Sequence, residues 1–315
     1  MQKKEITGKI FDIKGFSVHD GPGIRVTLFL KGCPLRCPWC HSPESQALHT
    51  ELNWMGKKCL GVEKCGRCLG ICPRGAISPG IKTGGYSAAG VNINRSNCDN
   101  CGICAKACNA GALFLCGIDY TIDEIMDKIL RDMLFFKRSG GGVTISGGEC
   151  LCQPEFTLEV LKRCKKESIH TAVDTSGYVK WEVIESILPY TDLFLYDIKG
   201  IDAALHERVI GVSNWQILEN ARKIAVRGGE FHIRIPVIPD YSDSADVFDD
   251  IGKFIHELGG AVKAVQILPY HDLGTAKWER LQKKKPALAI KPPSDELINA
   301  RKKQLEDMGF IVIVG

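Results

Sequence analysis

Six short, almost continuously apolar segments recur along the chain, and amphipathic stretches separate most of them. The apolar segments are residues 24–32 (IRVTLFLKG), 143–148 (VTISGG), 170–177 (HTAVDTSG), 193–200 (LFLYDIKG), 231–240 (FHIRIPVIPD) and 264–272 (AVQILPYHD). The amphipathic stretches, with apolar residues three and four apart, are residues 155–166, 179–188, 214–226 and 246–258. Alternating strands and helices predict a parallel sheet whose strands are buried on both faces. We therefore predict an α/β fold, a partial (β/α)6 TIM-like barrel, with function at the carboxyl ends of its strands.

One cysteine-rich segment interrupts this alternation. Residues 54–116 contain nine of the fifteen cysteines and much glycine, and they separate the first apolar segment from the second. We expect residues 1–53 and 117–315 to form the barrel domain and residues 54–116 to form an inserted domain. A seventh apolar run, residues 310–315 (FIVIVG), follows a helical stretch at 295–308 and is expected to add a strand beside the barrel.

Composition and charge exclude few classes of protein. The chain of 315 residues is 44% hydrophobic and 25% charged, which is typical of a soluble globular protein, and its net charge of +4 is too small to indicate nucleic-acid binding. We find neither a signal-like apolar run at the N-terminus nor a stretch of membrane-spanning length. These features predict a cytoplasmic monomer with no nucleic-acid or membrane partner. Fifteen cysteines, an odd number, indicate metal binding rather than a complete disulfide framework.

Three cysteines follow the first predicted strand at C-x3-C-x2-C spacing: Cys33, Cys37 and Cys40. Four thiolates usually complete a 4Fe-4S cluster, so three leave one iron without a protein ligand. The amino and carboxylate groups of S-adenosylmethionine can bind such an iron, and reduction then breaks a carbon–sulfur bond of the cofactor. A zinc site, or three unrelated core cysteines, is the less favoured interpretation of this tight spacing.

Two further sets of four cysteines occupy the insertion. They are Cys59, Cys65, Cys68 and Cys72, and Cys98, Cys101, Cys104 and Cys108. The second set matches the two-cluster bacterial ferredoxin run, in which the fourth cysteine of each set ligates the other cluster. We thus expect Cys108 to complete the first cluster and Cys72 the second, in a ferredoxin-like domain with two 4Fe-4S clusters. Five residues separate Cys59 from Cys65, which requires a wide loop and leaves Cys116 as an alternative ligand; a zinc ribbon is the competing interpretation.

Five motifs between about Phe11 and Trp278 resemble those of the glycyl radical enzyme activating enzymes, which are radical S-adenosylmethionine proteins. They read DGPGIRVTLFLKGCPLRCPWCHSPES, GGGVTISGGE, VDTSG, LYDIKG and ILPYHDLGTAKW. The resemblance implies that a reduced cluster cleaves S-adenosylmethionine to a 5′-deoxyadenosyl radical, which removes a hydrogen atom from a glycine of a partner glycyl radical enzyme. A flavodoxin or ferredoxin would supply the electron. The insertion is similar to that of activases of the decarboxylase, dehydratase and lyase type.

The predicted cofactor contacts lie at the strand ends. In the turn Gly147–Gly148–Glu149, glycines allow close backbone approach to the amino-acid part of the cofactor, and a polar residue is expected to receive its ammonium group. The resemblance assigns Gly147 and Gly148 to the methionine part, although Cys150 stands where the family usually has proline. It also assigns further residues to the site: Asp174, Thr175 and Asp197 beside a monovalent cation, Lys199 near the cofactor carboxylate, His271 against the adenosine, and Asp20 at the partner's glycine loop.

Two further residues are candidate cofactor contacts, and two other functions compete with the activase interpretation. Arg234 on the fifth strand is a weaker cofactor contact, and Trp39 is expected to shield the cluster or to belong to the core. A radical enzyme acting on a small molecule or a peptide side chain is the first rival, but its extra clusters usually follow the barrel. An electron-transfer ferredoxin fused to a scaffold is the second, and it leaves the GGE turn unexplained. The sequence does not separate electron relay from partner docking as the role of the insertion.

Overall fold

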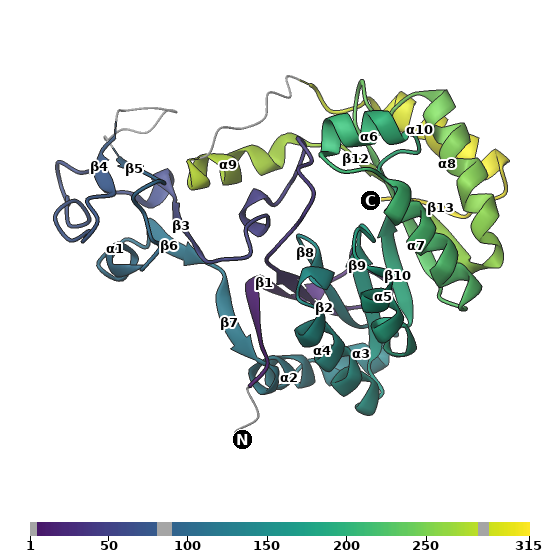
Figure 1. The fold of residues 1–315 in the computed structure, drawn as a ribbon, viewed down its shortest axis with the longest axis horizontal. Helices are drawn as coiled ribbons and strands as arrows, with labels where there is room; N and C mark the ends of the chain where they lie inside the picture. Colours follow the sequence, from purple (N-terminus) through teal and green to yellow (C-terminus); the bar gives the residue numbers. More distant parts are fainter. Residues whose placement is uncertain (1–4, 81–89, 283–289) are drawn as a thin grey trace.

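The computed structural model describes residues 5–80, 90–282 and 290–315, which form a curved nine-stranded sheet, a layer of helices and a small outlying lobe (Figure 1). Across the sheet the strands are β13 (Val312–Val314), β12 (Val262–Pro269), β11 (Phe231–Val237), β10 (Leu193–Asp197), β9 (His170–Thr175), β8 (Gly142–Gly147), β2 (Arg25–Leu30), β1 (Thr7–Ser17) and β7 (Ile118–Thr121). Every neighbouring pair from β2 to β13 is parallel. The six predicted strands are thus confirmed as parallel neighbours in chain order, with the C-terminal strand beside them.

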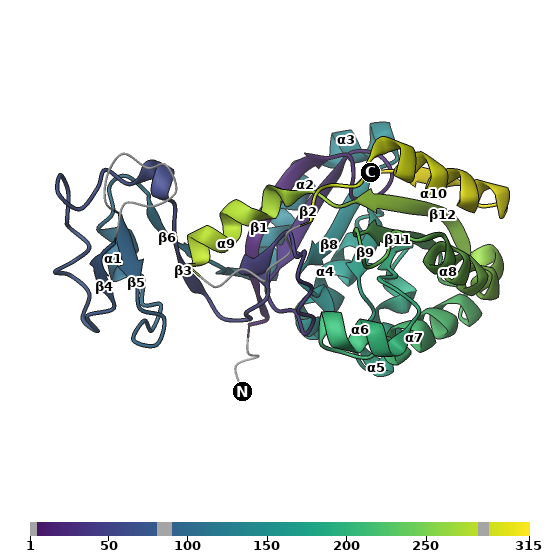
Figure 2. The same cartoon turned by 90° about the horizontal axis from the view of Figure 1, so that it is seen from above.

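Amphipathic helices cover the outer face of the sheet (Figure 2). They are α4 (Pro154–Lys166), α5 (Trp181–Ile187), α7 (Trp215–Val226), α8 (Ala245–Leu258) and α10 (Asp295–Asp307), whereas α6 (Ala203–Ile210) packs through Ile210 on Leu35 and Cys37 in the loop after β2. Helix α8 shows why they pack there: Ser244 caps its first turn, and Phe248, Ile251 and Ile255 on one face are fully buried. This burial fixes the sheet's curvature and brings the carboxyl ends of the parallel strands to one rim.

Two antiparallel strands extend the sheet beyond the prediction. Strand β1 pairs with β2 on one side and with β7 on the other. Its register shifts between Ile10 and Asp12 and again between Lys14 and Ser17, and such bulges destroy the period-two pattern that reveals a strand. Five helices also escaped prediction: α1 (Ile103–Lys106), α2 (Ile122–Leu130), α3 (Met133–Ser139), α6 (Ala203–Ile210) and α9 (Thr275–Leu281). Six 3-10 helices complete the described chain: Pro43–Ser45, Gly56–Lys58, Cys150–Cys152, Leu188–Tyr190, Gly259–Ala261 and Asp272–Gly274.

The lobe between β2 and β8 has its own small core. Strand β3 (Glu51–Trp54) pairs antiparallel with β6 (Leu113–Cys116), so the chain enters and leaves the lobe side by side. Strands β4 (Ile77–Pro79) and β5 (Val91–Ile93) form a second pair, and α1 (Ile103–Lys106) is one turn long. Helix α9 reaches from the barrel toward the lobe in Figures 1 and 2, and the Gln282 amide that follows it bonds the backbone of Val91 and Ile93, each at 2.7 Å. No described helix has the length and apolarity needed to cross a membrane.

Candidate active site

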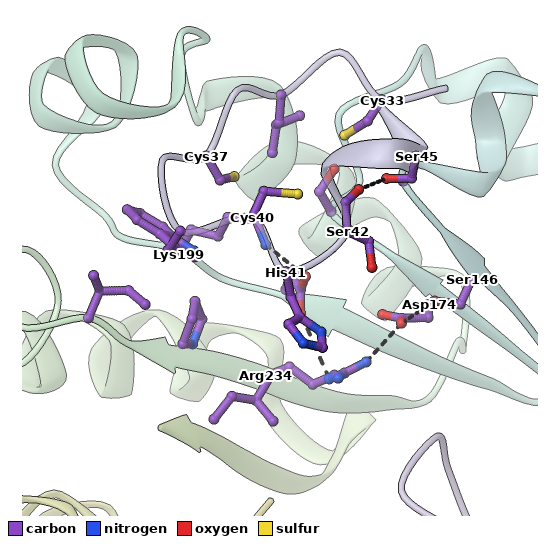
Figure 3. Close-up of a pocket in the computed structure, with 18 of the residues that line it drawn as sticks. Cys33, Cys37, Cys40, His41, Ser42, Ser45, Ser146, Asp174, Lys199 and Arg234 are labelled. Atoms are coloured by element: carbon purple, nitrogen blue, oxygen red, sulfur yellow. Dashed lines mark hydrogen bonds and ion pairs between the residues drawn. The ribbon is translucent and has the colours of Figure 1, made fainter. Parts of the chain in front are cut away.

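A cavity of about 410 Å³ opens at the carboxyl ends of the parallel strands (Figure 3). Its lining includes twelve of the residues predicted for the site: Cys33, Cys37, Trp39, Cys40, Gly147, Gly148, Asp174, Thr175, Asp197, Lys199, Arg234 and His271. They come from six different strand ends or the loops that follow, as expected where parallel strands end at one rim. Two predicted residues, Asp20 and Glu149, are absent from the lining.

The cysteine triplet lies on the loop that follows β2. Backbone bonds fix this loop, including Cys33 N–H to Gln46 O at 3.1 Å and Cys40 N–H to Cys37 O at 3.0 Å. The three sulfur atoms face a shared space in Figure 3. Burial raises the pKa of the Cys37 thiol to about 12 and also raises the pKa values of Cys33 and Cys40. Such thiols stay protonated alone and ionise when soft, positively charged iron binds them, so the donor set fits an iron–sulfur cluster.

The glycines after β8 are required by the packing of the protein itself. Gly147 has φ +133°, and a Cβ atom there would lie 2.1 Å from the Leu30 carbonyl oxygen. A Cβ on Gly148 would lie 2.6 Å from the Gly32 oxygen and 2.9 Å from Cys33 Cβ. Only glycine therefore lets the end of β8 lie directly against the cysteine loop. The turn and the triplet form one wall because of this close approach.

Glu149 lies behind that wall, away from the cavity. Its side chain is fully buried and accepts hydrogen bonds from Thr175 Oγ1 at 2.7 Å, Ser176 Oγ at 2.7 Å and Ser176 N–H at 2.9 Å. Burial raises its pKa despite these donors. The carboxylate thus ties the turn after β8 to the end of β9, and the structure gives no support for the predicted contact between this side chain and the cofactor ammonium.

Replacing Glu149 with glutamine is expected to lower the free energy of unfolding by about 2 kcal/mol, because an amide nitrogen cannot accept from Ser176. Urea unfolding of the purified protein measures this loss. Glu155→Gln, an exposed substitution in the first turn of α4, serves as the control and should leave stability within about 0.5 kcal/mol of the native chain. Equal stability of the two variants would contradict a tying role for Glu149.

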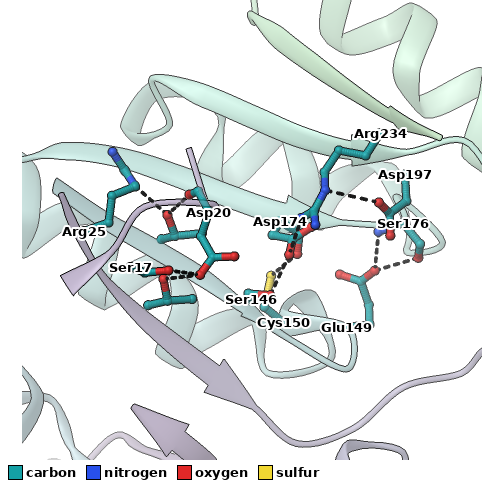
Figure 4. A network of polar contacts seen from close by, with 12 residues as sticks. Ser17, Asp20, Arg25, Ser146, Glu149, Cys150, Asp174, Ser176, Asp197 and Arg234 are labelled. Carbon is teal, nitrogen blue, oxygen red and sulfur yellow. Dashed lines mark hydrogen bonds and ion pairs between the residues drawn. The ribbon is translucent and has the colours of Figure 1, made fainter. Parts of the chain in front are cut away.

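Two ion pairs form a charged wall of the cavity, and Figure 4 shows Arg234 of this wall beside Asp174 and Asp197. Arg234 Nη1 lies 2.9 Å from Asp174 Oδ2, which also accepts from Ser146, and Lys199 Nζ lies 2.7 Å from Asp197 Oδ2. Burial raises the pKa of Asp174, because it outweighs the opposing charge of Arg234. Burial alone would lower the pKa values of Lys199 and Arg234, but the neighbouring carboxylates raise both. All four groups are held in their charged network by one another.

This network leaves hydrogen-bonding capacity unused. Asp197 Oδ1 and Arg234 Nε are buried without a hydrogen-bond partner in the described structure, and they lie 3.9 Å apart. A buried polar atom without a partner is costly, so these two atoms mark where a polar ligand would be stabilised. Thr175 Oγ1, by contrast, is already used by Glu149.

Aromatic residues line the opposite side of the cavity. The His271 ring packs edge-on against the His41 ring with 4.6 Å between centroids, and Trp39 packs on Tyr241 at 4.7 Å. Burial, followed by the charges of Lys277 and His271, lowers the pKa of His41 to about 4, so this ring is neutral at pH 7. Sequence reasoning missed His41, although its position directly after Cys40 gave a usable signal.

Asp20 lies outside the cavity lining and is hydrogen-bonded to β2 and β8. Its carboxylate accepts from Ser17 Oγ and from Thr27 Oγ1, the latter at 2.8 Å, and its backbone oxygen accepts from Thr144. The charge of Asp20 contributes to the raised pKa values of Asp174 and Arg234. Figure 4 shows these groups along one polar lane.

The lobe gathers its cysteines in two groups. One small cavity is lined by Cys59, Cys65, Cys68 and Cys108, together with apolar residues. Burial raises the pKa of Cys104 to about 11, with further contributions from nearby Cys98, Cys72 and Cys101. Cys108, the fourth cysteine of the second set, thus lies with the first set. Cys116 is not in the first cavity; its charged neighbours are Lys31, Glu44 and Glu51.

Comparison with protein families agrees with this geometry. Residues 97–251 match the Radical SAM superfamily, residues 58–112 a 4Fe-4S dicluster domain, and residues 19–61 a 4Fe-4S single cluster domain. A radical SAM methyltransferase from Sphaerobacter thermophilus shares the fold, with a TM-score of 0.54 and 12% identity over 99% of this chain and 77% of that one. The fold, the cysteine triplet and these matches define a radical S-adenosylmethionine enzyme.

Relatives of higher sequence identity show to which family of radical enzymes the chain belongs. The chain is 43% identical over 286 residues to an isethionate sulfite-lyase activating enzyme of Nitratidesulfovibrio vulgaris, covering 90% of both chains. It is 42% identical over 299 residues to an indoleacetate decarboxylase activating enzyme of Tractidigestivibacter scatoligenes, covering 92% of both. The chain belongs to the glycyl radical enzyme activating enzymes. It cleaves S-adenosylmethionine reductively, and the resulting 5′-deoxyadenosyl radical takes a hydrogen atom from a glycine of the partner enzyme.

Proposed function

We propose that Cys33, Cys37 and Cys40 would ligate the 4Fe-4S cluster that this reaction uses, and that three protein ligands would leave one iron for the cofactor. The observation that carries the proposal is that the three thiols share one cavity with a glycine wall and a charged wall. When bound, the cluster supplies the electron that breaks the carbon–sulfur bond of the cofactor. The chain itself binds and orients the cofactor and excludes water around it.

The methionine part of the cofactor fits between the two walls. Backbone groups of Gly147 and Gly148 are accessible there because no side chain covers them. Lys199 and Arg234 place positive charge in the same cavity, where a carboxylate would be attracted, and the unpartnered Asp197 oxygen is suited to an ammonium group or a monovalent cation. Glu149 acts as a positioning residue behind the turn. Thr175 is a weaker cation ligand than predicted because its hydroxyl donates to Glu149.

The adenosine part is proposed to lie on the aromatic side of the cavity. His271 and His41 present ring surfaces there, and Trp39 covers the cysteine loop together with Tyr241. Asp20, on the polar lane outside the cavity lining, is in position to meet a backbone amide of the partner's glycine loop. A loop entering along this lane brings its Cα hydrogen toward the cofactor.

We further propose that residues 54–116 form a ferredoxin-like domain with two more 4Fe-4S clusters. The grouping of Cys108 with Cys59, Cys65 and Cys68 supports the first ligand set, and the proximity of Cys72 to Cys104 supports the second. A flavodoxin or ferredoxin would supply electrons to the monomeric enzyme. The partner belongs to the lyase, dehydratase or decarboxylase type, since relatives named for all three are 40–43% identical to this chain.

The test of this function is the formation of a glycyl radical. Anaerobically reconstituted protein, dithionite and S-adenosylmethionine are mixed with isethionate sulfite-lyase, sulfopropanediol dehydratase or indoleacetate decarboxylase, and the electron paramagnetic resonance spectrum is recorded. A glycyl doublet with one partner is expected. Cofactor cleavage without a doublet for any of them would favour a small-molecule or peptide substrate.

The cluster count has a separate test. Reconstituted protein should contain about 12 iron atoms per chain, and Cys108→Ala should lower this by about four, because the first quartet loses a ligand. Cys116→Ala is the matched control, since this buried thiol lies outside both groups, and it should keep the full iron content. If Cys116→Ala lost iron and Cys108→Ala did not, the proposed ligand sets would be wrong.

A further inference from the structure

The wide loop between Cys59 and Cys65 carries an exposed surface that the proposed chemistry does not use. We call it the loop face and define it as Lys57, Lys58, Leu60, Lys64 and Arg67, all of which are exposed. Leu60 is 60% exposed, although leucine usually avoids solvent. Gly61, with φ +87°, turns the chain directly after it. The loop face therefore combines one exposed apolar side chain with four exposed basic ones, and the exposed Glu63 beside Lys64 adds one acidic group.

Basic and acidic residues are distributed unevenly along the chain, and the basic loop face lies in the part with an excess of basic residues. Residues 54–116 contain eight lysines and arginines against two acidic residues, whereas the remainder has 33 basic and 35 acidic residues. Within the described residues, no ion pair joins the four basic side chains of the loop face to an acid, unlike Arg74, which pairs with Asp99 at 3.2 Å. The thiolates that hold the proposed clusters would offset part of the positive charge of residues 54–116. The exposed basic side chains of the loop face remain available to a partner.

The loop face lies directly over the first cysteine group. Leu60 and Arg67 line the same small cavity as Cys59, Cys65, Cys68 and Cys108. Cys65 is itself exposed, so a cluster held there would lie near the surface at this point. A protein seated on the loop face would be separated from the cluster by little more than the loop.

We propose that the loop face docks an acidic one-electron carrier protein and that the electron enters the enzyme at the first lobe cluster. This inference rests on the two proposed lobe clusters and adds the point of entry. The carrier is oxidised by one electron and the cluster is reduced by one, with no bond made or broken. A mainly basic surface with one exposed apolar side chain suits a short-lived complex, in which charge steers the encounter and little area is buried. The glycyl radical partner must instead reach the barrel cavity.

The test compares a charge-reversed loop face with a matched control. The variant is Lys57→Glu/Lys58→Glu/Lys64→Glu, and the control is Arg131→Glu/Lys166→Glu/Lys180→Glu, which reverses three exposed groups on the barrel. The probe is a flavodoxin, oxidised for binding by calorimetry and reduced for driving cofactor cleavage. At low salt we expect the variant to lose about tenfold or more in affinity and in flavodoxin-driven rate, with weaker salt dependence. Its iron content and dithionite-driven rate should match those of the control.

Leu60→Ser tests the exposed apolar side chain separately: it should weaken flavodoxin binding while leaving the salt dependence unchanged. Native affinity, rate and salt dependence in the charge-reversed variant would overturn the proposal, as would an equal loss in the control. A loss confined to glycyl radical formation under dithionite would instead assign the loop face to the glycyl radical enzyme. Failure of the native protein to cleave the cofactor with dithionite would count against the proposed function itself.

Discussion

Replacing Cys37 with alanine is expected to abolish cofactor cleavage, with a rate at least about 10³-fold below that of the native enzyme, because the site cluster loses one of only three protein ligands. Cys37 is the most deeply buried of the three thiols, so no water-exposed group can take its place. Single-turnover formation of methionine under dithionite measures the rate. The iron content should fall by about four atoms per chain while the lobe clusters remain.

Cys164→Ala is the matched control for this variant. Cys164 is also a buried thiol, but it lies on α4 on the outer side of the sheet, far from the cavity lining. We expect it to cost some stability by leaving a small void, and to keep both the iron content and the cleavage rate. Substantial cleavage by Cys37→Ala would show that the cluster is held by other residues.

Arg234→Met is expected to lower the free energy of unfolding by about 3–5 kcal/mol, because it leaves buried carboxylates without their cation. Asp174 would lose its ion pair at 2.9 Å, and Asp197 the nearby guanidinium. Urea unfolding measures the loss. Arg227→Met removes an exposed pair with Glu185 and should cost no more than about 1 kcal/mol. Similar losses in the two variants would argue against a buried charged wall.

The loss in Arg234→Met should depend on pH. Arg234 opposes the burial that raises the pKa of Asp174, so its removal raises that pKa further. A folded-state pKa above the unfolded value means that the folded state binds more protons, and stability then falls as the pH rises through the folded-state pKa. The deficit relative to the native protein should therefore be smaller in mildly acidic than in mildly alkaline buffer. A deficit independent of pH would contradict this assignment.

The strand ends were predictable because a simple rule governs them. Parallel strands in chain order must bring Gly147, Asp174 and Asp197 to one rim, whatever the details of packing. The cysteine triplet follows the first of these strands, so it reaches the same rim. Residue spacing could thus predict the cysteine triplet and the rim on which the site lies, whereas the roles of the individual strand-end residues came from the resemblance to the family.

The remaining features depend on contacts that spacing does not reveal. Glu149 turns away from the cavity because two hydroxyl groups donate hydrogen bonds to its carboxylate there, those of Thr175 at the end of β9 and of Ser176 directly after it. Strand β1 was missed because two bulges interrupt its pattern, and α6 because eight residues give a weak periodicity. The grouping of the lobe cysteines was anticipated only through the ferredoxin pattern.

The paired strands β3 and β6 have a consequence for protein engineering. Glu51 and Cys116 are direct partners in this ladder, so the two ends of the lobe lie no farther apart than neighbouring strands. A short turn joining them would span the gap without pulling on β2 or β8, and we expect a shortened chain of this kind to keep the barrel. We accordingly expect that the lobe can be deleted or exchanged by cutting the chain at this one strand pair, with the loss of the Gln282 hydrogen bonds to Val91 and Ile93.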